Sequence, residues 1–557
     1  MDLNKIKNEL IFIPLGGSGE IGMNLNLYHY KGKWLIVDFG AGFADQDLPG
    51  VDMIVPDISF LIKIKKDILG MILTHAHEDH LGAVQYLWDE INCPVFTTPF
   101  TATFLKSKLS EIEFSNKIII NEVSPGGKIE LSPFKIELVP LTHSAPEMQA
   151  LVIRTELGNI LHTGDWKFDH DPLIGLANDE VLLKQYGEEG ILAMVGDSTN
   201  VFNPGVSGSE GDLRKSMYKI IKDCKNLVAV TTFASNVARI ETIIKVAEEC
   251  GRRVVLAGRS LWRVTDAAKE VGYLRDIQPF LDESEISKFP KEKILVLCTG
   301  CQGETLAAST KIANKSHPYI RLSPGDTVIF SSKIIPGNEK KIFKLFNLLV
   351  KQEVEVLTEK DHFVHVSGHP AREELIKMYK LVKPQVAIPV HGELVHMHEH
   401  AKLALEVGVP KSITVENGDM VKLAPGNSEI IAKVQAGYLA IDGHYLIAPN
   451  SPIMRIRRKI QNEGIVIITL VFDSKRSLLT LPIINTPGIL DRVEDSKLID
   501  SIIKELVKNI KSFVETAKKT KISNEAIINL TRSVVRRMIK SNSGKNPIID
   551  VNIERIN

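Results

Sequence analysis

The chain of 557 residues is too long for a single hydrophobic core and predicts about two to four domains. Lysine plus arginine equals aspartate plus glutamate, at 68 each, so the net charge does not point to a nucleic-acid partner. The five cysteines are scattered without a CxxC pair, which indicates neither a thiolate zinc site nor a disulfide framework. Because the sequence shows neither a signal-peptide pattern nor an apolar run near 18 residues, we expect a cytoplasmic globular protein.

The first apolar run, Leu10 to Leu15, leads into a glycine-rich turn whose residues 17–22 read GxGxxG. A dinucleotide site requires a helix directly after this motif. Residues 24–30 instead alternate polar and apolar side chains, which predicts a strand. We therefore expect a tight turn between two strands here.

Histidines and aspartates follow the next two strand-like runs. The run 33–40 contains Asp38, which we expect to orient a ligand histidine. The run 68–73 leads into Thr-His-Ala-His-Glu-Asp-His at residues 74–80, at the start of a predicted helix. Imidazole and carboxylate groups at one strand-to-helix turn predict a metal centre of the zinc type. The acidic loop 41–52 lacks the spacing of an EF-hand and is expected to be solvated.

Two later strand ends add candidate ligands. The run 131–141 precedes His143, and the run 159–162 precedes Asp165, whose two oxygens could bridge two metals. His162 and His170 are interpreted as non-ligands. Asp38, the 75–80 cluster, His143 and Asp165 stand in the order of the metallo-β-lactamase motifs, and the chain resembles that fold. The fold serves many hydrolytic substrates, so the substrate must be inferred from the rest of the chain.

Strands at 227–233, 253–257, 293–299 and 327–331 alternate with helical segments. Such alternation over about 150 residues predicts an inserted domain with a parallel sheet. Its strands end in small polar and glycine motifs, which we expect to line one edge because ligands bind at the carboxyl ends of parallel strands.

Three further motifs surround this insertion: Asp197, His365 to His369, and His391. With the earlier motifs they resemble the β-CASP nucleases, and most closely the bacterial ribonuclease J group. The resemblance covers about residues 10–445 and rests on Asp-Ser-Thr-Asn (197–200), Thr-Phe-Ala-Ser-Asn (232–236), Thr-Gly-x-Gln-Gly-Glu (299–304), His-x-Ser-Gly-His (365–369) and Pro-Val-His-Gly-Glu (389–393). Cys301 departs from the serine expected there, a small change that should not touch the metals.

The resemblance implies an α/β fold with several domains. These are a metallo-β-lactamase αββα sandwich at 1–209 and 360–430, an inserted β-CASP parallel-sheet domain at 210–359, a linker at 431–455 and a small C-terminal α/β domain at 456–557. In the last, the apolar stripe of a helix at 498–513 is interpreted as core, with a dimer surface as the alternative. A second helix, from about 524 to 539, carries Arg532, Arg536 and Arg537 on its polar side.

The resemblance also implies two zinc ions per subunit, with Mn²⁺ or Mg²⁺ as substitutes in vitro. The implied ligands are His75, His77, His143 and Asp165 for one ion, and Asp79, His80, Asp165 and His391 for the other. His369, held by Asp197, resembles the general-acid pair of the family. A structural calcium ion of the family would correspond to the backbone oxygens of Pro49 and Val51 and to Asp442.

Contacts with RNA are implied for the 365–369 motif and for the strand ends of the insertion. The candidates are His365, Val366, Ser367, Gly368 and His369 as a phosphate clamp, and Ser235, Asn236, Arg239, Arg259, Ser331 and Ser332 around RNA phosphates or a 5′-monophosphate. His396, His398 and His400, at a two-residue spacing, cannot share one helix face and are expected to be mainly solvated.

The resemblance implies a zinc-dependent ribonuclease acting on single-stranded RNA. Its expected activities are 5′→3′ exonuclease, preferring a 5′-monophosphate, and endonuclease, in rRNA maturation and mRNA decay. Expected partners are RNA, a second copy in a homodimer or homotetramer, and an RNA-decay complex or the ribosome, with no membrane.

Three alternatives compete with this reading of the sequence. A small-molecule hydrolase such as a thioesterase or lactonase would have no use for the insertion. A DNA-directed β-CASP nuclease remains open because the sequence does not reveal recognition of a 2′-hydroxyl. A degraded RNA-binding scaffold would lack ligands, whereas none is missing here.

Overall fold

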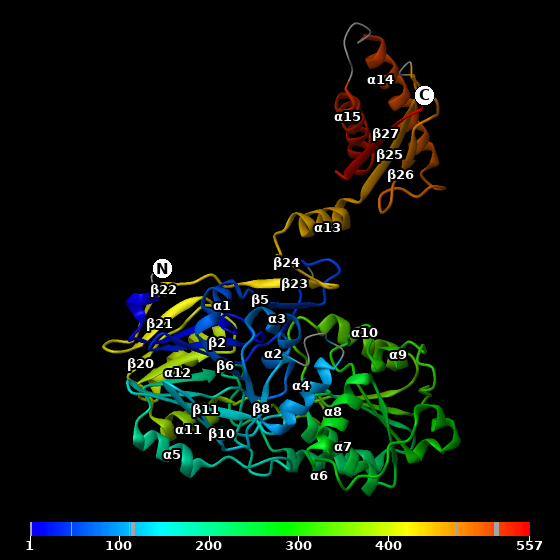
Figure 1. Cartoon of the computed structure of the whole chain (residues 1–557). Helices are drawn as coiled ribbons and strands as arrows, with labels where there is room; N and C mark the ends of the chain where they lie inside the picture. Colours follow the sequence, from blue (N-terminus) through cyan, green and yellow to red (C-terminus); the bar gives the residue numbers. More distant parts are fainter. Residues whose placement is uncertain are drawn as a thin grey trace. The chain divides into compact units, whose positions relative to one another are not determined.

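The computed structural model describes residues 3–45, 47–110, 112, 117–474, 477–516 and 523–556 (Figure 1). Contacts divide the chain into two compact units, residues 1–42 with 55–437 and residues 43–54 with 438–557. Among the described residues, no helix has the length and apolar character needed to cross a membrane.

Two β-sheets form the framework of the first unit. Over the described residues the first sheet has the order β22 (Glu429–Lys433), β21 (Asp419–Ala424), β1 (Leu10–Gly16), β2 (Leu25–Tyr30), β3 (Lys33–Val37), β6 (Ile68–Ile72), β7 (Val95–Thr97), β8 (Ile120–Glu122). The second has the order β20 (Lys411–Ser412), β19 (Val386–Val390), β13 (Ala193–Asp197), β12 (Gly158–His162), β11 (Gln149–Thr155), β10 (Phe134–Pro140), β9 (Lys128–Leu131). The strand expected after the GxGxxG turn is confirmed, since β1 and β2 pair antiparallel.

The main core lies between these two sheets. Phe12 and Tyr28 from the first sheet belong to the same buried cluster as Ile136, Leu151 and Ile388 from the second. β1 is buried along its whole length, which explains its continuous apolar run, whereas β10 alternates buried and exposed side chains toward the edge.

Helices cover the outer faces of both sheets. Leu183 of α5 (Glu180–Glu189), Leu375 of α11 (Arg372–Val382) and Leu403 of α12 (Leu394–Glu406) share a second buried cluster with the seven-stranded sheet. On the other sheet, Phe60 of α1 (Ser59–Ile64) packs edge-on against Trp34 of β3. The further helices of this part are α2 (Glu78–Leu81), α3 (Val84–Ile91) and α4 (Pro99–Leu109). This αββα arrangement confirms the expected architecture.

An all-parallel sheet forms the inserted domain, which confirms the βα pattern of the sequence. Its order within the described residues is β15 (Arg253–Ala257), β16 (Ile294–Cys298), β14 (Val228–Thr231), β17 (Thr327–Phe330), β18 (Glu355–Leu357). The helices of this domain are α6 (Glu210–Asp223), α7 (Val237–Glu249), α8 (Arg259–Glu270), α9 (Ala308–Ala313) and α10 (Glu339–Val350). Because every strand runs the same way, the polar motifs after β14, β15, β16 and β17 come to one edge.

The second unit holds the C-terminal part of the chain. Its elements are β23 (Tyr438–Asp442), β24 (Tyr445–Ile447), α13 (Pro452–Glu463), β25 (Ile465–Phe472), β26 (Ile483–Asn485), α14 (Ser496–Thr516), α15 (Asn524–Ser543) and β27 (Ile548–Arg555). The segment 43–54 adds Phe43 of β4 (Gly42–Phe43) and the first two residues of β5 (Met53–Pro56). Strands thus occupy much of the segment 431–455 that we expected to be a linker. Ile502, Leu506 and Ile510 of α14 are buried in one cluster with β25 and α15, so the core interpretation of this stripe is confirmed.

Candidate metal centre

Two groups of histidine and aspartate side chains converge above the two large sheets. The ligand atoms of each group lie within 4.8 Å of one another, and the groups are His75, His77, His143 and Asp165, and Asp79, His80, Asp165 and His391. His75 and His77 lie in the loop between β6 and α2, and Asp79 and His80 lie in α2 itself. The other members follow β10, β12 and β19. The structure therefore brings together the seven side chains that the resemblance implied as ligands.

The outer nitrogen of four of these histidines is already engaged. With Nδ1 assigned as the protonated nitrogen, the donor–acceptor pairs are His75 to Thr74 Oγ1 at 3.0 Å, His80 to Asp38 Oδ2 at 2.7 Å, His143 to the Gly368 carbonyl at 2.6 Å, and His391 to Asn24 Oδ1 at 3.0 Å. Nε2 is then the nitrogen that each ring can offer to a metal, as in ligand histidines of metal sites. In this structure it lies 3.1 Å from Asn24 Nδ2 in His80 and 3.0 Å from His77 Nδ1 in His143.

One oxygen of Asp165 lies at the middle of this set. Its Oδ2 is 3.1 Å from Nε2 of His80, 3.5 Å from Nε2 of His391 and 4.0 Å from Nε2 of His143. Asp165 is 2% exposed and belongs to both groups, so its carboxylate can serve two cations at once.

The donor set fits divalent metal ions. The Nε2 atom of His75 is buried and has no hydrogen-bond partner among the described residues, which is costly unless a cation binds it. Burial lowers the pKa of His77 to about 4 and that of His143 well below 6.5, so both rings are neutral and able to bind metal near neutral pH. Five imidazoles and a shared carboxylate suit zinc better than calcium or magnesium.

Asp38 contacts the histidines of this centre through two routes. Its carboxylate accepts the Nδ1 hydrogen of His80, and it also accepts a hydrogen bond from the hydroxyl of Thr74 at 3.0 Å. Because Thr74 in turn accepts the Nδ1 hydrogen of His75, one buried carboxylate orients two ring planes.

Asn24 is a part of the site that sequence reasoning missed. Its side-chain oxygen accepts from His391, and its side-chain nitrogen donates to the backbone oxygen of Asp79 at 3.2 Å. Its position directly after the GxGxxG turn could have indicated this role. Because that turn does not form a dinucleotide site, the side chains beside it are available to contact another site.

His369 and Asp197 form a pair at the rim of the centre. Nδ1 of His369 lies 2.8 Å from Oδ2 of Asp197, and the His369 side chain is 23% exposed. Burial lowers the pKa of His369, but the carboxylates of Asp197 and Asp165 outweigh it and raise the pKa from 6.5 to about 9. The ring is therefore protonated at neutral pH and its Nε2 is able to donate.

The 365–369 motif lies directly against the centre. A Cβ atom at Gly368 would come within 2.7 Å of Cε1 of His143, so only glycine fits there. The Ser367 hydroxyl accepts from Asn200 Nδ2 at 2.7 Å and from the backbone N–H of His369 at 3.1 Å. The hydroxyl proton of Ser367 is therefore available for donation to a further acceptor.

The candidate RNA contacts of the inserted domain differ in accessibility. Arg259 is exposed and Ser235 half-buried, whereas Asn236 and Ser331 are buried. Asn236 caps α7 by accepting from the backbone N–H of Arg239 at 2.9 Å. The Ser331 hydroxyl donates to the Val364 carbonyl at 2.7 Å. Of the six candidates in this domain, Arg259 offers the most accessible charge.

The expectation that Arg239 contacts RNA is wrong. Its guanidinium is fully buried and forms two hydrogen bonds with the carboxylate of Glu210, at 2.9 and 3.1 Å. It also donates to the backbone oxygens of Ser331 and Val366. Arg239 therefore ties the inserted domain to the 365–369 motif.

The histidines expected to lie outside the metal centre do so, but one is not solvated. His162 bonds to Tyr28 Oη at 2.9 Å, and His170 is exposed. His398 is exposed and His396 half-buried. His400 is fully buried, with Nδ1 2.9 Å from Ser198 Oγ and Nε2 2.8 Å from Tyr379 Oη.

The proposed calcium ligands do not fit a cation in this structure. Both carboxylate oxygens of Asp442 accept hydrogen bonds from the guanidinium of Arg457, at 2.7 and 2.8 Å. A Cβ atom at Gly50, between Pro49 and Val51, would lie 4.0 Å from the same guanidinium. The guanidinium of Arg457 thus occupies the carboxylate of Asp442, which calcium would need as a ligand.

Known proteins match this chain along almost all of its length. The models described as the metallo-β-lactamase superfamily, the β-CASP domain of ribonuclease J, the RNA specificity domain of Zn-dependent metallo-hydrolases and the C-terminal domain of ribonuclease J match residues 24–191, 225–349, 353–414 and 452–556. A protein named Ribonuclease J of Sinorhizobium meliloti is 41% identical over 556 residues, covering 98% of each chain. The chain belongs to the ribonuclease J family.

Other members of the ribonuclease J family match at a similar extent. Ribonuclease J2 of Bacillus subtilis is 32% identical over 541 residues, covering 96% of this chain and 97% of its own. A solved structure of a protein of unknown function from Enterococcus faecalis covers 74% of this chain with a TM-score of 0.54 and 19% identity, a likeness of fold alone. Family membership and the donor set together make this chain a metal-dependent ribonuclease.

Proposed function

We propose that this ribonuclease degrades single-stranded RNA from the 5′ end, prefers a 5′-monophosphate and also cleaves internally. The observation that carries this proposal is the His369–Asp197 pair, which lies beside a two-cation donor set that continues through Asp165. A thioester releases a thiolate, which can leave without a proton donor, so a thioesterase has no need for this pair beside the metal ligands.

Two ions are proposed for the two donor groups, zinc in the cell and Mn²⁺ or Mg²⁺ as substitutes in vitro. When bound, such ions would supply Lewis acidity for a phosphate and a hydroxide nucleophile at neutral pH. His75, His77 and His143 would hold one ion, Asp79, His80 and His391 the other, and Asp165 both. The buried Nε2 atoms fix these positions before any substrate binds.

The residues of the chain then handle the leaving group. As the P–O3′ bond breaks, the 3′ oxygen takes the proton from Nε2 of His369, while Asp197 keeps the ring oriented through Nδ1. The free hydroxyl proton of Ser367 is available to a phosphate oxygen, and Gly368 lets the backbone approach the same phosphate closely.

Recognition of a 5′-monophosphate is proposed for the carboxyl edge of the inserted sheet. The helices α7 and α8 begin at this edge, and a helix N-terminus attracts anions. Arg259 adds an exposed guanidinium, and Ser235 a half-buried hydroxyl. Asn236 and Ser331, whose side chains serve neighbouring backbone, would shape this edge.

In the cell we propose roles in rRNA maturation and mRNA decay in the cytoplasm, as a homodimer or homotetramer and in contact with an RNA-decay complex or the ribosome. The similarity to proteins named Ribonuclease J and the match to an RNA specificity domain support an RNA substrate, on which these proposed roles depend.

The test compares one single-stranded RNA with a 5′-monophosphate and with a 5′-triphosphate, and a DNA of the same sequence. The variants are wild type, His77→Ala, and His398→Ala as a matched histidine on the exposed side of α12. We expect mononucleotide release from the monophosphate RNA that is lost in His77→Ala and kept in His398→Ala. Turnover of a thioester or lactone without RNA cleavage would overturn the proposal.

A further inference from the structure

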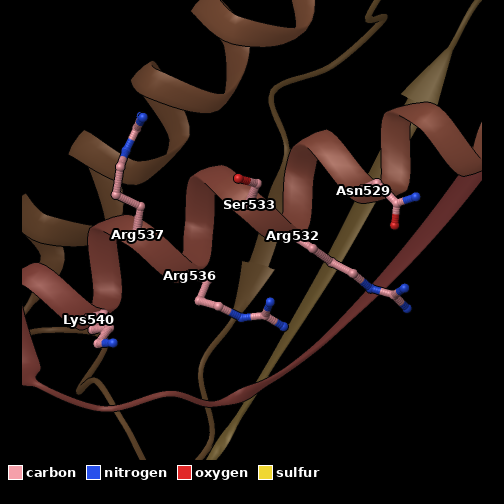
Figure 2. A pocket seen from close by; sticks show the side chains of 6 residues that line it. All are labelled: Asn529, Arg532, Ser533, Arg536, Arg537 and Lys540. Atoms are coloured by element: carbon pink, nitrogen blue, oxygen red, sulfur yellow. The ribbon is translucent and has the colours of Figure 1, made fainter.

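Helix α15 presents a strongly basic face to solvent. An open hollow of about 540 Å³ on it is lined by Asn529, Arg532, Ser533, Arg536, Arg537 and Lys540 (Figure 2). All six side chains offer hydrogen-bond donors, and none of them is acidic or aromatic. The metal centre uses none of these residues.

The packing of α15 fixes this face outward. Ile527, Val534, Val535 and Ile539 are buried in the core of the second unit, so the helix cannot rotate. On the outer side, Arg532, Arg536 and Lys540 follow one another at four-residue steps. Each step advances about 6 Å along the axis, which arranges the cations in a row.

Little of this positive charge is neutralised inside the protein. Arg537 lies 3.4 Å from Glu505, and its side chain is 66% exposed. Toward the residues that the structure describes, Arg532 donates only its Nε hydrogen, to the Ile549 carbonyl at 3.2 Å. Within the described part of the chain, neither Arg536 nor Lys540 has a carboxylate within 4 Å.

The basic face belongs to a basic part of the chain. Residues 438–557 contain 20 lysines and arginines and 12 aspartates and glutamates, a net charge of +8. Since the whole chain is neutral with 68 of each kind, residues 1–437 carry −8. Although the whole chain is neutral, its C-terminal segment is basic and the rest is acidic. This distribution favours binding of a polyanion by the C-terminal segment.

We propose that the basic face of α15 is an RNA-binding surface that holds phosphates of the substrate strand other than the one at the bond being cleaved. The proposal rests on RNA being the substrate. Arginine forks bind phosphates in a bidentate way, and serine and asparagine side chains add donors to phosphate and sugar oxygens. With no aromatic side chain to stack on bases, the surface reads the backbone and is indifferent to sequence.

A second copy of the chain is a poorer occupant of this face. An isologous contact would bring the same four cations against each other. An acidic protein partner would also match the charge of this face. If such a protein were the occupant, substitutions on the face would leave RNA affinity unchanged, so RNA-binding measurements distinguish a protein occupant from RNA.

The test removes two cations from α15 and, as a matched control, two at the same spacing from α13. The pairs are Arg536→Glu with Lys540→Glu, and Arg455→Glu with Lys459→Glu, and all four side chains are exposed. Binding of the full-length enzyme to a cleavage-resistant phosphorothioate single strand of about 30 nucleotides is followed by anisotropy from about 50 to 200 mM salt.

We expect the α15 pair to weaken binding about tenfold and to lower the salt slope by about 1.4, since each lost phosphate contact removes about 0.7. The α13 pair should stay within about twofold of wild type. Hydrolysis of bis(p-nitrophenyl) phosphate, which reports on the metal centre alone, should be unchanged in both. On RNA, KM should rise while kcat is retained.

If the α15 and α13 pairs lost RNA affinity equally, the effect would come from net charge and the proposal would be overturned. Wild-type RNA affinity in the α15 pair would also overturn it. A change of mass in sedimentation without a change in RNA affinity would assign the face to a protein partner. The affinity is measured without cleavage, so a failure of the proposed exonuclease would appear separately, as absent RNA turnover in wild type.

Discussion

The carboxylate of Asp38 accepts the Nδ1 hydrogen of His80 at 2.7 Å from a backbone that is left-handed, with φ of 63°. A non-glycine residue in this region costs about 1–2 kcal/mol. His391 shares this conformation, with φ of 52°. Backbone strain at two positions around one centre indicates that packing holds these side chains in place for binding.

Asp38→Asn should lower the metal affinity about 10- to 100-fold, because asparagine keeps the shape and the left-handed backbone but loses the charge that orients His80 and His75. The measurement is metal content after dialysis against graded chelator. Asp212→Asn, at an exposed carboxylate, should retain its metal. Wild-type metal retention in Asp38→Asn would contradict the orienting role of Asp38.

His369→Gln should reduce kcat about 10²- to 10⁴-fold while metal content stays at the wild-type level, because the proton donor is lost and the ligands are not. Asp197→Asn should show a smaller loss in the same direction, since His369 remains but is less well oriented. Rate measurements on an RNA whose leaving group is an acidic phenol check the assignment, because such a group needs no proton. If His369→Gln also lost metal, His369 would be a ligand, a role that its membership in a third donor group with Asp165, Asp197 and His391 allows.

The sequence predicted the fold class and the inserted parallel sheet because their apolar runs and turns are local signals. The residues from His75 to His80 could be found for the same reason, since one turn carries four donors. His391 could be named only through the resemblance, as it lies 316 residues from His75. Asn24 is marked only by its place beside the glycine turn, and its role appears only when that turn packs against His391.

His400 and Arg239 show where residue type misled. Arginine is mostly exposed in proteins and histidine is often partly exposed, and a two-residue spacing does exclude a shared helix face. Yet the helix has a buried stripe at helical intervals, formed by Met397, His400, Ala401 and Ala404. The apolar members of this stripe could have indicated that His400 faces the core. Arg239 is likewise buried because Glu210 neutralises it, a pairing across 29 residues that no spacing rule contains.

His400→Leu should lower the free energy of unfolding of the first unit by about 1–3 kcal/mol. The reason is that Ser198 Oγ and Tyr379 Oη would lose their partner in a buried site. Urea denaturation followed by tryptophan fluorescence measures the change. His398→Leu, on the exposed side of the same helix, should stay within about 0.5 kcal/mol of wild type. Equal stability of the two variants would contradict the buried bridge.

Calcium should not stabilise this protein, in contrast to what the resemblance implied. Arg457 holds both oxygens of Asp442, so a cation would have to displace a guanidinium and two charge-assisted hydrogen bonds. We expect the same Tm in millimolar calcium and in a chelator selective for calcium. Arg457→Ala frees the carboxylate, so any calcium response should arise in that variant. A bound ion at about 100 times its Kd would add about 2.7 kcal/mol, so a calcium-dependent rise of Tm in wild type that Asp442→Asn abolishes would show that Arg457 gives way.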